Sequence, residues 1–338
     1  MPQLVKTALL VVSLSLAASA CGGSSKPAAS GTASNTPSAA PSAATSGAPA
    51  AASGAFYVFL PKSLNNPYWV DAKKGMDAES AKLGVKAEFL GPAEDDAAKQ
   101  VAIFESVLSR KPAGIAISPN DAASVKELVS RARAAGIPVL AWDGPVPGSE
   151  VQGYVGTNNV EAGKKEGEAL AAAIGNKGKV AIVIGSLSAP NLKQRLEGLK
   201  TALKAFPDIK VVATEESNES VATAQTKAET ILQAHPDLAG FAGIGGSDLP
   251  GIAGALKSNG GCGRIKAVGF DVVPQGIAGM KAGCVQALVS QKPYGMTAKA
   301  LDLLIDLHGG KPLASNNVDT GVVVVDKSSL AAFLTSPH

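Results

Sequence analysis

Residues 114–144 read GIAISPNDAASVKELVSRARAAGIPVLAWDG and contain one complete strand–helix–strand unit. The apolar runs 114–117 and 137–142 are continuous rather than alternating, which is typical of strands that are buried on both faces. Between them, residues 122–135 place apolar side chains at helical spacing, and Gly136 follows where a left-handed helix cap is expected. The stretch therefore predicts a parallel sheet that is covered by helices on both faces.

The same pattern continues outward from this unit in both directions. Further apolar runs are predicted as strands at 56–60, 85–90, 180–184, 209–213, 238–244, 265–270 and 285–289. They are separated by helix-length segments such as 95–110, 161–174 and 192–205, and a helix at 293–308 and a strand at 322–325 complete the pattern. Because four strand–helix units precede Gly156 and five strands follow it, we predict an α/β fold of two doubly wound parallel-sheet lobes.

The first 54 residues differ in composition from the rest of the chain. Residues 1–20 carry one charge, Lys6, and an apolar run at 8–16, followed by small residues up to Cys21. This order is typical of a secretory signal, and the run is shorter than the roughly 20 residues that span a bilayer. Residues 22–54 are almost wholly Gly, Ser, Ala, Pro and Thr, so we predict a flexible tether at 21–54 behind a removed signal at 1–20.

The segment Ala18-Ser19-Ala20-Cys21 resembles the lipobox of bacterial lipoproteins, in which the cysteine is acylated and becomes the mature N-terminus. One departure is Ala18, which stands where that box usually has Leu. The resemblance implies an exported protein that is lipid-anchored through Cys21 to the outer face of the cytoplasmic membrane, or one that is periplasmic.

The remaining chain has balanced charge and two cysteines. Without Lys6 and Lys26, the chain has 29 of its 31 basic residues and 28 acidic residues, and the basic residues form no stripe. Nucleic acid is therefore not expected as a partner. Cys262 and Cys284 each precede a predicted strand, and an even pair in an exported protein favours a disulfide. Two free, buried thiols are the alternative.

Polar side chains follow the predicted strands, where ligands bind in open parallel sheets. These residues are Asn65, Asn66, Ser118, Asn120, Asp143, Asp248, Asp271 and Gln291, and Arg195 lies on the helix after residues 180–184. Together they offer donors, acceptors and one guanidinium group, which suits hydroxyl groups because each hydroxyl both donates and accepts. The sequence therefore predicts a site for a small polyhydroxylated ligand.

Aromatic side chains stand beside several of these polar residues. Tyr68 and Trp69 fall in the polar loop after the first strand, where a role in stacking on the apolar face of a sugar ring is favoured. Trp142 ends a buried strand directly before Asp143, so core packing and a pocket role are equally supported for it.

Some carboxylates at strand ends have a simpler explanation as helix N-caps. Asp95 and Asp121 each stand before a predicted helix and suit that role. Asp143 does not, because residues 144–148 (GPVPG) follow it and cannot start a helix.

The motifs of common enzymes do not occur in the sequence. The turn at 61–69 has no Gly-x-Gly-x-x-Gly, and residues 243–246 (GIGG) lack the Lys-Ser/Thr of a phosphate-binding loop. The three histidines, His235, His308 and His338, fall at helix ends or the terminus, away from the polar strand ends. We therefore predict no catalytic activity, no cofactor and no metal site.

From residue 55 to about 325 the chain resembles the type I periplasmic binding proteins of the ribose-binding family, the simple-sugar receptors of ABC importers. The residues that carry the resemblance are Leu64-Asn65-Asn66-Pro67-Tyr68-Trp69, Ile117-Ser118-Pro119-Asn120-Asp121, Ile137-Pro138-Val139 through Asp143, Arg195 with Glu197-Gly198, Ala234-His235-Pro236-Asp237, and Val268-Gly269-Phe270-Asp271 with Pro274. Their order and spacing over the full length make the match specific at the level of the family.

The resemblance implies ligand contacts from both lobes. Those of the first lobe are Asn66, Tyr68, Trp69 and Asp143; those of the second are Arg195, Asp248, Asp271 and Gln291. We also predict ligand contacts from Ser118 and from Lys62, which stands where the family commonly has a neutral residue. The ribose receptors have Asn at Ser118, Arg at Gly144 and Asn near Asp248, and their aromatic residue before the helix at 222–232 has no counterpart in residues 217–220 (SNES). We therefore expect a monosaccharide or polyol other than ribose.

The resemblance also implies the domain organisation and the partners. The chain is expected to cross between lobes near 156–158, 291–293 and 318–320, through a three-strand hinge of the type I periplasmic binding protein. The N-terminal lobe would hold residues 55–157 plus 292–318, and the C-terminal lobe residues 158–291 plus 319–338. The implied function is that of a monomeric receptor that closes on its ligand and delivers it to an ABC permease. The alternative is an exported sensory module that reports a sugar-like signalling molecule to a membrane receptor; the export signal argues against a transcriptional repressor core of the same fold.

Overall fold

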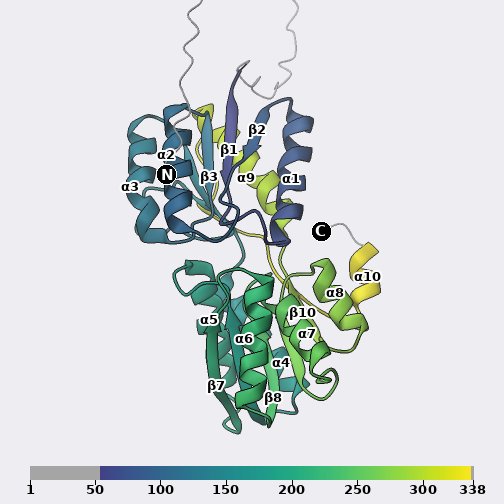
Figure 1. Cartoon of the computed structure of the whole chain (residues 1–338). Coiled ribbons are helices and arrows are strands. Elements are labelled where there is room, and N and C mark those ends of the chain that lie inside the picture. Colours follow the sequence, from purple (N-terminus) through teal and green to yellow (C-terminus); the bar gives the residue numbers. More distant parts are fainter. Residues whose placement is uncertain (1–53, 336–338) are drawn as a thin grey trace, which may run out of the picture. The chain divides into compact units, whose positions relative to one another are not determined.

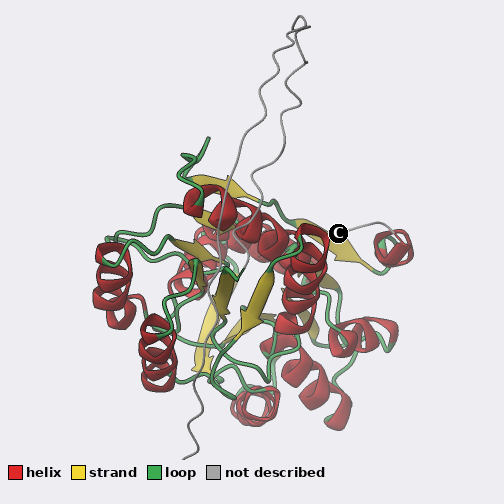
Figure 2. Cartoon of the chain, turned by 90° about the horizontal axis from the view of Figure 1, so that it is seen from above, coloured by secondary structure: helices red, strands yellow, loops and turns green. Residues whose placement is uncertain are grey.

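The computed structural model describes residues 54–335, which form two six-stranded sheets with helices on both faces of each (Figures 1 and 2). The first sheet has the order β11-β5-β4-β3-β1-β2, and its strands are β1 (Phe56–Leu60), β2 (Lys86–Phe89), β3 (Gly114–Ile117), β4 (Val139–Trp142), β5 (Tyr154–Gly156) and β11 (Asn317–Asp319). The second has the order β12-β10-β9-β8-β6-β7, and its strands are β6 (Gly178–Ile184), β7 (Ile209–Glu216), β8 (Leu238–Gly243), β9 (Lys266–Phe270), β10 (Ala287–Ser290) and β12 (Val323–Asp326). All pairs are parallel except β10 with β12, which confirms the predicted fold class.

Each sheet and the helices that pack on it are called a lobe below. The first lobe has α1 (Tyr68–Leu83), α2 (Ala97–Ser109), α3 (Ala122–Ala134) and α9 (Pro293–His308). The second lobe has α4 (Asn159–Ala173), α5 (Pro190–Leu203), α6 (Val221–Ala234), α7 (Asp248–Ser258), α8 (Pro274–Lys281) and α10 (Leu330–Thr335). Although α9 comes late in the chain, Figure 1 shows its yellow-green ribbon among the purple and blue elements of the first lobe.

The central strands explain why the apolar runs are continuous. In β1, Tyr57 and Phe59 pack on the side of α1 and α9, whereas Val58 and Leu60 pack on the side of α2 and α3. Because successive side chains of a strand point to opposite faces, a strand between two helical layers must be apolar at every position. β6 repeats this arrangement in the second lobe.

Local signals set several helix ends. Gly84 and Gly136 adopt φ values of 66° and 76° after α1 and α3, as predicted for left-handed caps. Asp121 caps α3 by accepting a hydrogen bond from the amide of Ser124 at 2.9 Å, also as predicted. The prediction for Asp95 is wrong, because the neighbouring Asp96 caps α2.

The chain passes between the two sheets three times: after β5, between β10 and α9, and between β11 and β12. The strands β5 and β11, of three residues each, were not predicted as strands, because such short segments carry too little periodicity to be recognised. They pair with each other at the edge of the first sheet beside the crossings. The boundaries given above for the two lobes stay a prediction.

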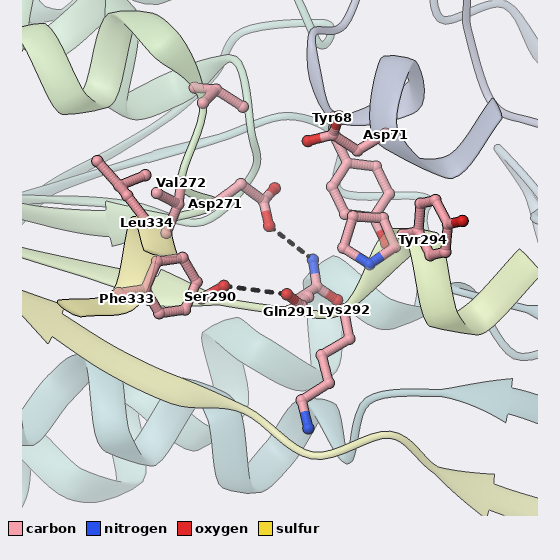
Figure 3. Close-up of a pocket in the computed structure, with 12 residues that line it drawn as sticks. Tyr68, Asp71, Asp271, Val272, Ser290, Gln291, Lys292, Tyr294, Phe333 and Leu334 are labelled. Atoms are coloured by element: carbon pink, nitrogen blue, oxygen red, sulfur yellow. Dashed lines mark hydrogen bonds between the residues drawn. The ribbon is translucent and has the colours of Figure 1, made fainter. Parts of the chain in front are cut away.

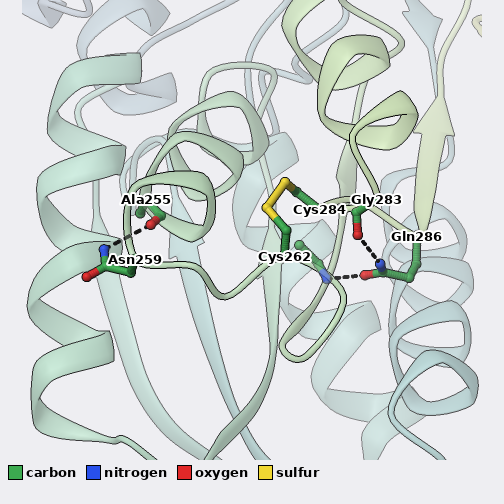
Figure 4. Close-up of a disulfide and its surroundings, with 7 residues drawn as sticks. Ala255, Asn259, Cys262, Gly283, Cys284 and Gln286 are labelled. Atoms are coloured by element: carbon green, nitrogen blue, oxygen red, sulfur yellow. Dashed lines mark hydrogen bonds between the residues drawn. A yellow bond between two sulfur atoms is a disulfide. The ribbon is translucent and has the colours of Figure 1, made fainter.

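Cys262 and Cys284 are joined by a disulfide (Figure 4). Cys262 lies in the turn before β9, and Cys284 lies between α8 and β10. Because β9 and β10 are parallel neighbours, their amino ends lie side by side, and the bond joins the two connections at that edge.

The predicted signal, the tether and Cys21 lie outside the described residues. Within residues 54–335, every helix is too short or too polar to cross a membrane.

Candidate functional site

The polar strand ends of the two lobes meet around a cavity of about 10 Å³. Its lining comes from both lobes: Lys62, Asn66, Tyr68, Trp69, Asp143, Asn191, Leu192, Arg195, Glu219, Gly245, Gly246, Asp271 and Gln291. A space of this size holds about one water molecule, so the side chains of the two walls are nearly in contact. Eight of the ten ligand contacts predicted from the sequence line it; Ser118 and Asp248 lie behind the lining.

The lining residues of the first lobe are called the first wall below, and those of the second lobe the second wall. Asp143 accepts three hydrogen bonds in the first wall. It follows β4 with a φ of 57°, and its Oδ2 accepts hydrogen bonds from Lys62 Nζ at 2.8 Å, Ser118 Oγ at 2.7 Å and Asn191 Nδ2 at 3.2 Å. Burial alone would raise the pKa of Asp143, but the charges of Lys62 and Arg195 and the hydrogen bonds lower it below its usual value. Ser118 thus orients Asp143 from behind, and Asp143 is an ionised acceptor at neutral pH.

The aromatic residues form one cluster at the base of the first wall. Tyr68 and Trp69 lie in the first turn of α1, and not in a loop as predicted, because Pro67 already has helical backbone angles. The rings of Trp69 and Trp142 meet edge to face with centroids 5.3 Å apart, and Trp142 also packs on Phe59. Trp142 is fully buried in the core cluster of the first lobe and does not line the cavity, so core packing, and not a pocket role, is its place. Trp69 lines the cavity, and Lys62 Nζ lies 5.6 Å from its ring centroid.

Arg195 is the main cation of the second wall. It lies on α5, is 2% exposed, and its guanidinium is 4.1 Å from the ring centroid of Phe270. Nε donates to Asn159 Oδ1 at 2.9 Å, Nη1 to the carbonyl of Ile244 at 3.2 Å, and Nη2 to Gln291 Oε1 at 2.6 Å. These partners are all neutral, so its charge remains available to the cavity.

Asp271 and Gln291 extend this network. Gln291 Nε2 donates to Asp271 Oδ1 at 2.9 Å, and Gln291 Oε1 also accepts from Thr157 Oγ1 at 3.1 Å. Burial raises the pKa of Asp271 to about 6, although Arg195 and Gln291 act to lower it. Gln291 directly follows β10 at one of the crossings between the two sheets, so the network reaches that crossing.

Asp248 does not line the cavity but lies behind the residues that do. It begins α7, and its carboxylate accepts from Ser217 Oγ at 2.5 Å and from the amide of Gly245 at 2.7 Å. Burial raises its pKa to about 7, and the charge of Glu219 adds to this effect. Asp248 therefore holds two loops of the second wall in place.

Five residues of the lining were not predicted: Asn191, Leu192, Glu219, Gly245 and Gly246. Asn191 precedes Arg195 by one turn of α5, so helical spacing could have revealed it. Glu219 stands in the segment 217–220, whose sequence indicated only that the aromatic residue of the ribose receptors is missing. Asn66 Nδ2 donates to Glu219 Oε2 at 2.7 Å, and this bond joins the two walls, as does the bond from Asn191 to Asp143.

Asp95, which was predicted as a helix cap, lies near the boundary between the two lobes. Its carboxylate accepts a hydrogen bond from the Asn120 side chain, and Ser188 of the second lobe donates to the carbonyl of Asn120 at 3.1 Å. Burial, followed by the charge of Glu219, raises the pKa of Asp95 to about 7. Asp95 and Asn120 thus belong to the rim between the lobes, whereas Asn65 is exposed.

A larger pocket of about 500 Å³ adjoins the cavity beside the second crossing (Figure 3). The two share Tyr68, Asp271 and Gln291, and the far wall of the pocket includes Phe333 and Leu334 of α10. Figure 3 shows Asp271 hydrogen-bonded to Gln291 in the wall of this pocket.

The arrangement suits the binding of a polar ligand. The lining presents carboxylates, amides, one ammonium and one guanidinium beside an indole, a combination that recognises hydroxyl groups and one apolar ring face. Among the described residues, the His, Cys, Asp and Glu side chains form no group of three that could hold a metal ion.

Known proteins share this sequence and fold. A model of the periplasmic binding protein domain matches residues 57–312. The D-allose-binding periplasmic protein of Escherichia coli is 30% identical over 265 residues, which cover 76% of this chain and 85% of that protein. The ribose import binding protein RbsB of Bacillus subtilis is 28% identical, with 74% and 80% covered.

Solved structures agree with these matches. A solute-binding protein of an ABC transporter from Burkholderia graminis, in complex with D-arabinose, has a TM-score of 0.79 and 34% identity, and the match covers 82% of this chain and 97% of that one. GanP, a glucose-galactose binding protein from Geobacillus stearothermophilus, has a TM-score of 0.77 and 32% identity, with 82% and 98% covered.

Proposed function

Because the chain belongs to the periplasmic binding protein family, we propose that it is the solute-binding receptor of an ABC importer and captures a monosaccharide or polyol between its lobes. The observation that carries this proposal is the convergence of hydrogen-bonding side chains from both lobes on one buried cavity. Receptors of this family bind solutes and are not enzymes, and the relatives and structures reported above are named for sugars.

Capture requires the walls to separate first. The cavity holds about one water molecule, and direct bonds between Asn66 and Glu219 and between Asn191 and Asp143 hold the walls together. A sugar would insert between these groups and replace the direct bonds by its own hydroxyls. Since ligand bonds to both walls form together only in the closed arrangement, binding free energy shifts the population toward closure.

Export and lipid anchoring through Cys21, and delivery to an ABC permease, belong to the same proposal. A sensory role is the second possibility, and one similar structure is a XylFII–LytSN complex with 30% identity and a TM-score of 0.76. Transport is favoured because the curated relative from Bacillus subtilis is named an import protein and similar structures are named ABC transporter proteins.

The proposal is tested by thermal unfolding and small-angle scattering with a panel of D-allose, D-arabinose, D-ribose, D-galactose and xylitol. A ligand at about 100 times its dissociation constant should add roughly 2.7 kcal/mol to the free energy of unfolding, and the scattering should show compaction. Asp271→Ala should lose about 1.5–3 kcal/mol of binding free energy, because a charged acceptor is removed.

Asp121→Ala is the matched control, since it removes a carboxylate that caps α3 and does not line the cavity. It should cost about 1 kcal/mol of stability and leave the ligand response unchanged. The proposal fails if neither this panel nor any other monosaccharide or polyol tested stabilises the parent, and the assigned site fails if Asp271→Ala responds as the parent does.

A further inference from the structure

Glu219 is held in the second wall by an unusual loop. It lies between β7 and α6, and Asn218 and Glu219 adopt consecutive left-handed conformations with φ values of 52° and 55°. The amide of Ser217 donates to the carbonyl of Ile184 at 2.8 Å, and the amide of Glu219 to that of Gly185 at 3.2 Å. Two non-glycine residues in this region cost free energy, and such strain is concentrated at functional sites.

Gly185 makes room for the carboxylate of Glu219. A Cβ atom at Gly185 would lie 2.6 Å from Glu219 Oε1, so this carboxylate would have to shift if residue 185 carried a side chain. The backbone of the second wall is thus shaped to accommodate this side chain, which is 4% exposed and lines the cavity.

Glu219 has a hydrogen-bond partner but no ion-pair partner in the described part of the chain. Its Oε2 accepts from Asn66 Nδ2, and the ion pairs formed within residues 54–335 do not include it. Lys62, whose charge acts on Glu219, is paired with Asp143. Burial raises the pKa of Glu219, as expected for a carboxylate that is removed from water without a cation in contact.

The cavity as a whole has more carboxylates than cations. Asp143, Glu219 and Asp271 line it, against Lys62 and Arg195. A ligand with only hydroxyl groups would satisfy the hydrogen bonds of Glu219 but leave its charge uncompensated. A protonated amine would donate to the same oxygen and form a charged pair, which is the stronger interaction in a buried site.

Building on the proposed function, we propose that Glu219 is a specificity-determining residue, which selects a monosaccharide or polyol with a protonated amino group over its neutral hydroxyl counterpart. The amino group would replace Asn66 as the donor to Glu219 when the ligand enters between the walls. The same charge excess would disfavour sugar acids.

The test is calorimetric titration of the full chain at pH 7 with matched sugars. The amines are D-glucosamine, D-galactosamine, D-mannosamine and 1-deoxynojirimycin; the neutral sugars are D-glucose, D-galactose and D-mannose; and D-galacturonate is the acid. At least one amine should bind about tenfold or more tightly than its neutral counterpart, with the acid weakest. In Glu219→Gln, a variant of the same shape, this amine should lose at least about tenfold in affinity, while its neutral counterpart changes by less than about threefold.

Glu215→Gln is the matched control, because Glu215 precedes the same loop but pairs with Lys227 at the surface. It should leave the preference unchanged, and the unliganded melting temperatures of both variants show that they fold. The inference is overturned if neutral sugars bind at least as tightly as the amines, or if Glu219→Gln weakens both series equally, as a simple latch between the lobes would. Binding of neutral sugars alone leaves the proposed function intact, and that function fails only if neither the neutral panel above nor the amines bind.

Discussion

Asp143 and Asp271 occupy equivalent places in the two lobes, each directly after a strand and each with a positive φ, of 57° and 70°. This conformation is unfavourable for a residue with a side chain, so the surrounding bonds must maintain it. The two carboxylates nevertheless differ in pKa. Asp143 contacts Lys62 and its pKa is lowered, whereas Asp271 contacts the neutral Gln291 and burial raises its pKa to about 6. Contacts at single atoms therefore set how strongly acidic each strand-end carboxylate is.

The raised pKa of Asp248 predicts how stability depends on pH. Its folded-state pKa is about 7 and its usual value is 3.8, so the folded protein holds more protons than the unfolded chain between these values. The contribution of this proton binding to the free energy of unfolding is complete below about pH 4 and is lost as the pH rises to about 7. Asp248→Asn should remove this loss and flatten the profile by up to roughly 4 kcal/mol. Urea unfolding from pH 4 to 8 measures it.

Asp237→Asn is the control for this experiment, since Asp237 pairs with Lys179 at the surface and its pKa is lowered, chiefly by that hydrogen bond. Asp237→Asn should leave the fall in the free energy of unfolding between about pH 4 and 7 as steep as it is in the parent. Parallel profiles for the parent and Asp248→Asn would show that Asp248 is ionised in the folded protein.

Close helix crossings position the second wall. A Cβ atom at Gly163 of α4 would lie 2.0 Å from the carbonyl oxygen of Arg195, and one at Gly198 of α5 would lie 2.0 Å from that of Val160. The two helices therefore touch backbone to backbone, and this contact sets where Arg195 enters the site. The first lobe has a similar close contact between α1 and α9, because a Cβ at Gly75 would lie 2.1 Å from the carbonyl oxygen of Tyr294.

Gly163→Ala should separate α4 from α5 and move Arg195. Overpacking of this kind costs about 1–3 kcal/mol of stability, and the affinity for the ligand should fall as well. Gly295→Ala is the matched control in helix α9, because a Cβ there meets nothing within 4 Å. It should stabilise the protein by about 0.5–1 kcal/mol through helix propensity and leave affinity unchanged. Equal effects of the two variants in urea unfolding and calorimetry would refute the role of the crossing.

At the scale of the molecule, three passes of the chain connect two sheets whose carboxyl ends form one cavity. Gln291 lies at one pass and bonds to both Arg195 and Asp271, so the polar network of the second wall is joined to that pass. In the proposed function this pass would act as a hinge, closure would depend on the ligand, and a permease would recognise the closed receptor. The proposed receptor would also have to stay near that permease.

Cys21→Ser tests how the receptor is retained. If Cys21 is acylated after signal cleavage, the parent should fractionate with membranes, and the variant should appear in the soluble or extracellular fraction. Lys26→Ala changes the tether without removing the thiol and should fractionate like the parent. A Cys21→Ser variant that remains with membranes as fully as the parent would contradict the anchor.

The sequence by itself determined the α/β class, most strands and the left-handed caps at Gly84 and Gly136, because these depend on apolar periodicity and on conformational preferences of neighbouring residues. It also indicated four residues of the cavity lining, Asn66, Asp143, Asp271 and Gln291, because the carboxyl ends of parallel strands meet at one edge. The other four predicted residues of the lining, Lys62, Tyr68, Trp69 and Arg195, came from the aromatic pattern and from the family resemblance. It misplaced the cap of α2 by one residue, because adjacent aspartates have the same propensity and only hydrogen-bond geometry separates Asp95 from Asp96.

Only the tertiary structure decided which groups face one another across the lobes. Glu219 gave no signal along the chain, because its significance comes from Asn66, which lies 153 residues away, and from the space left by Gly185. Trp142 fitted core and pocket equally until its packing against Phe59 and Trp69 placed it in the core. Ion pairing, burial and steric fit are sums over residues brought together from distant parts of the chain, so local sequence patterns specify the elements and their packing specifies the charge and shape of the site.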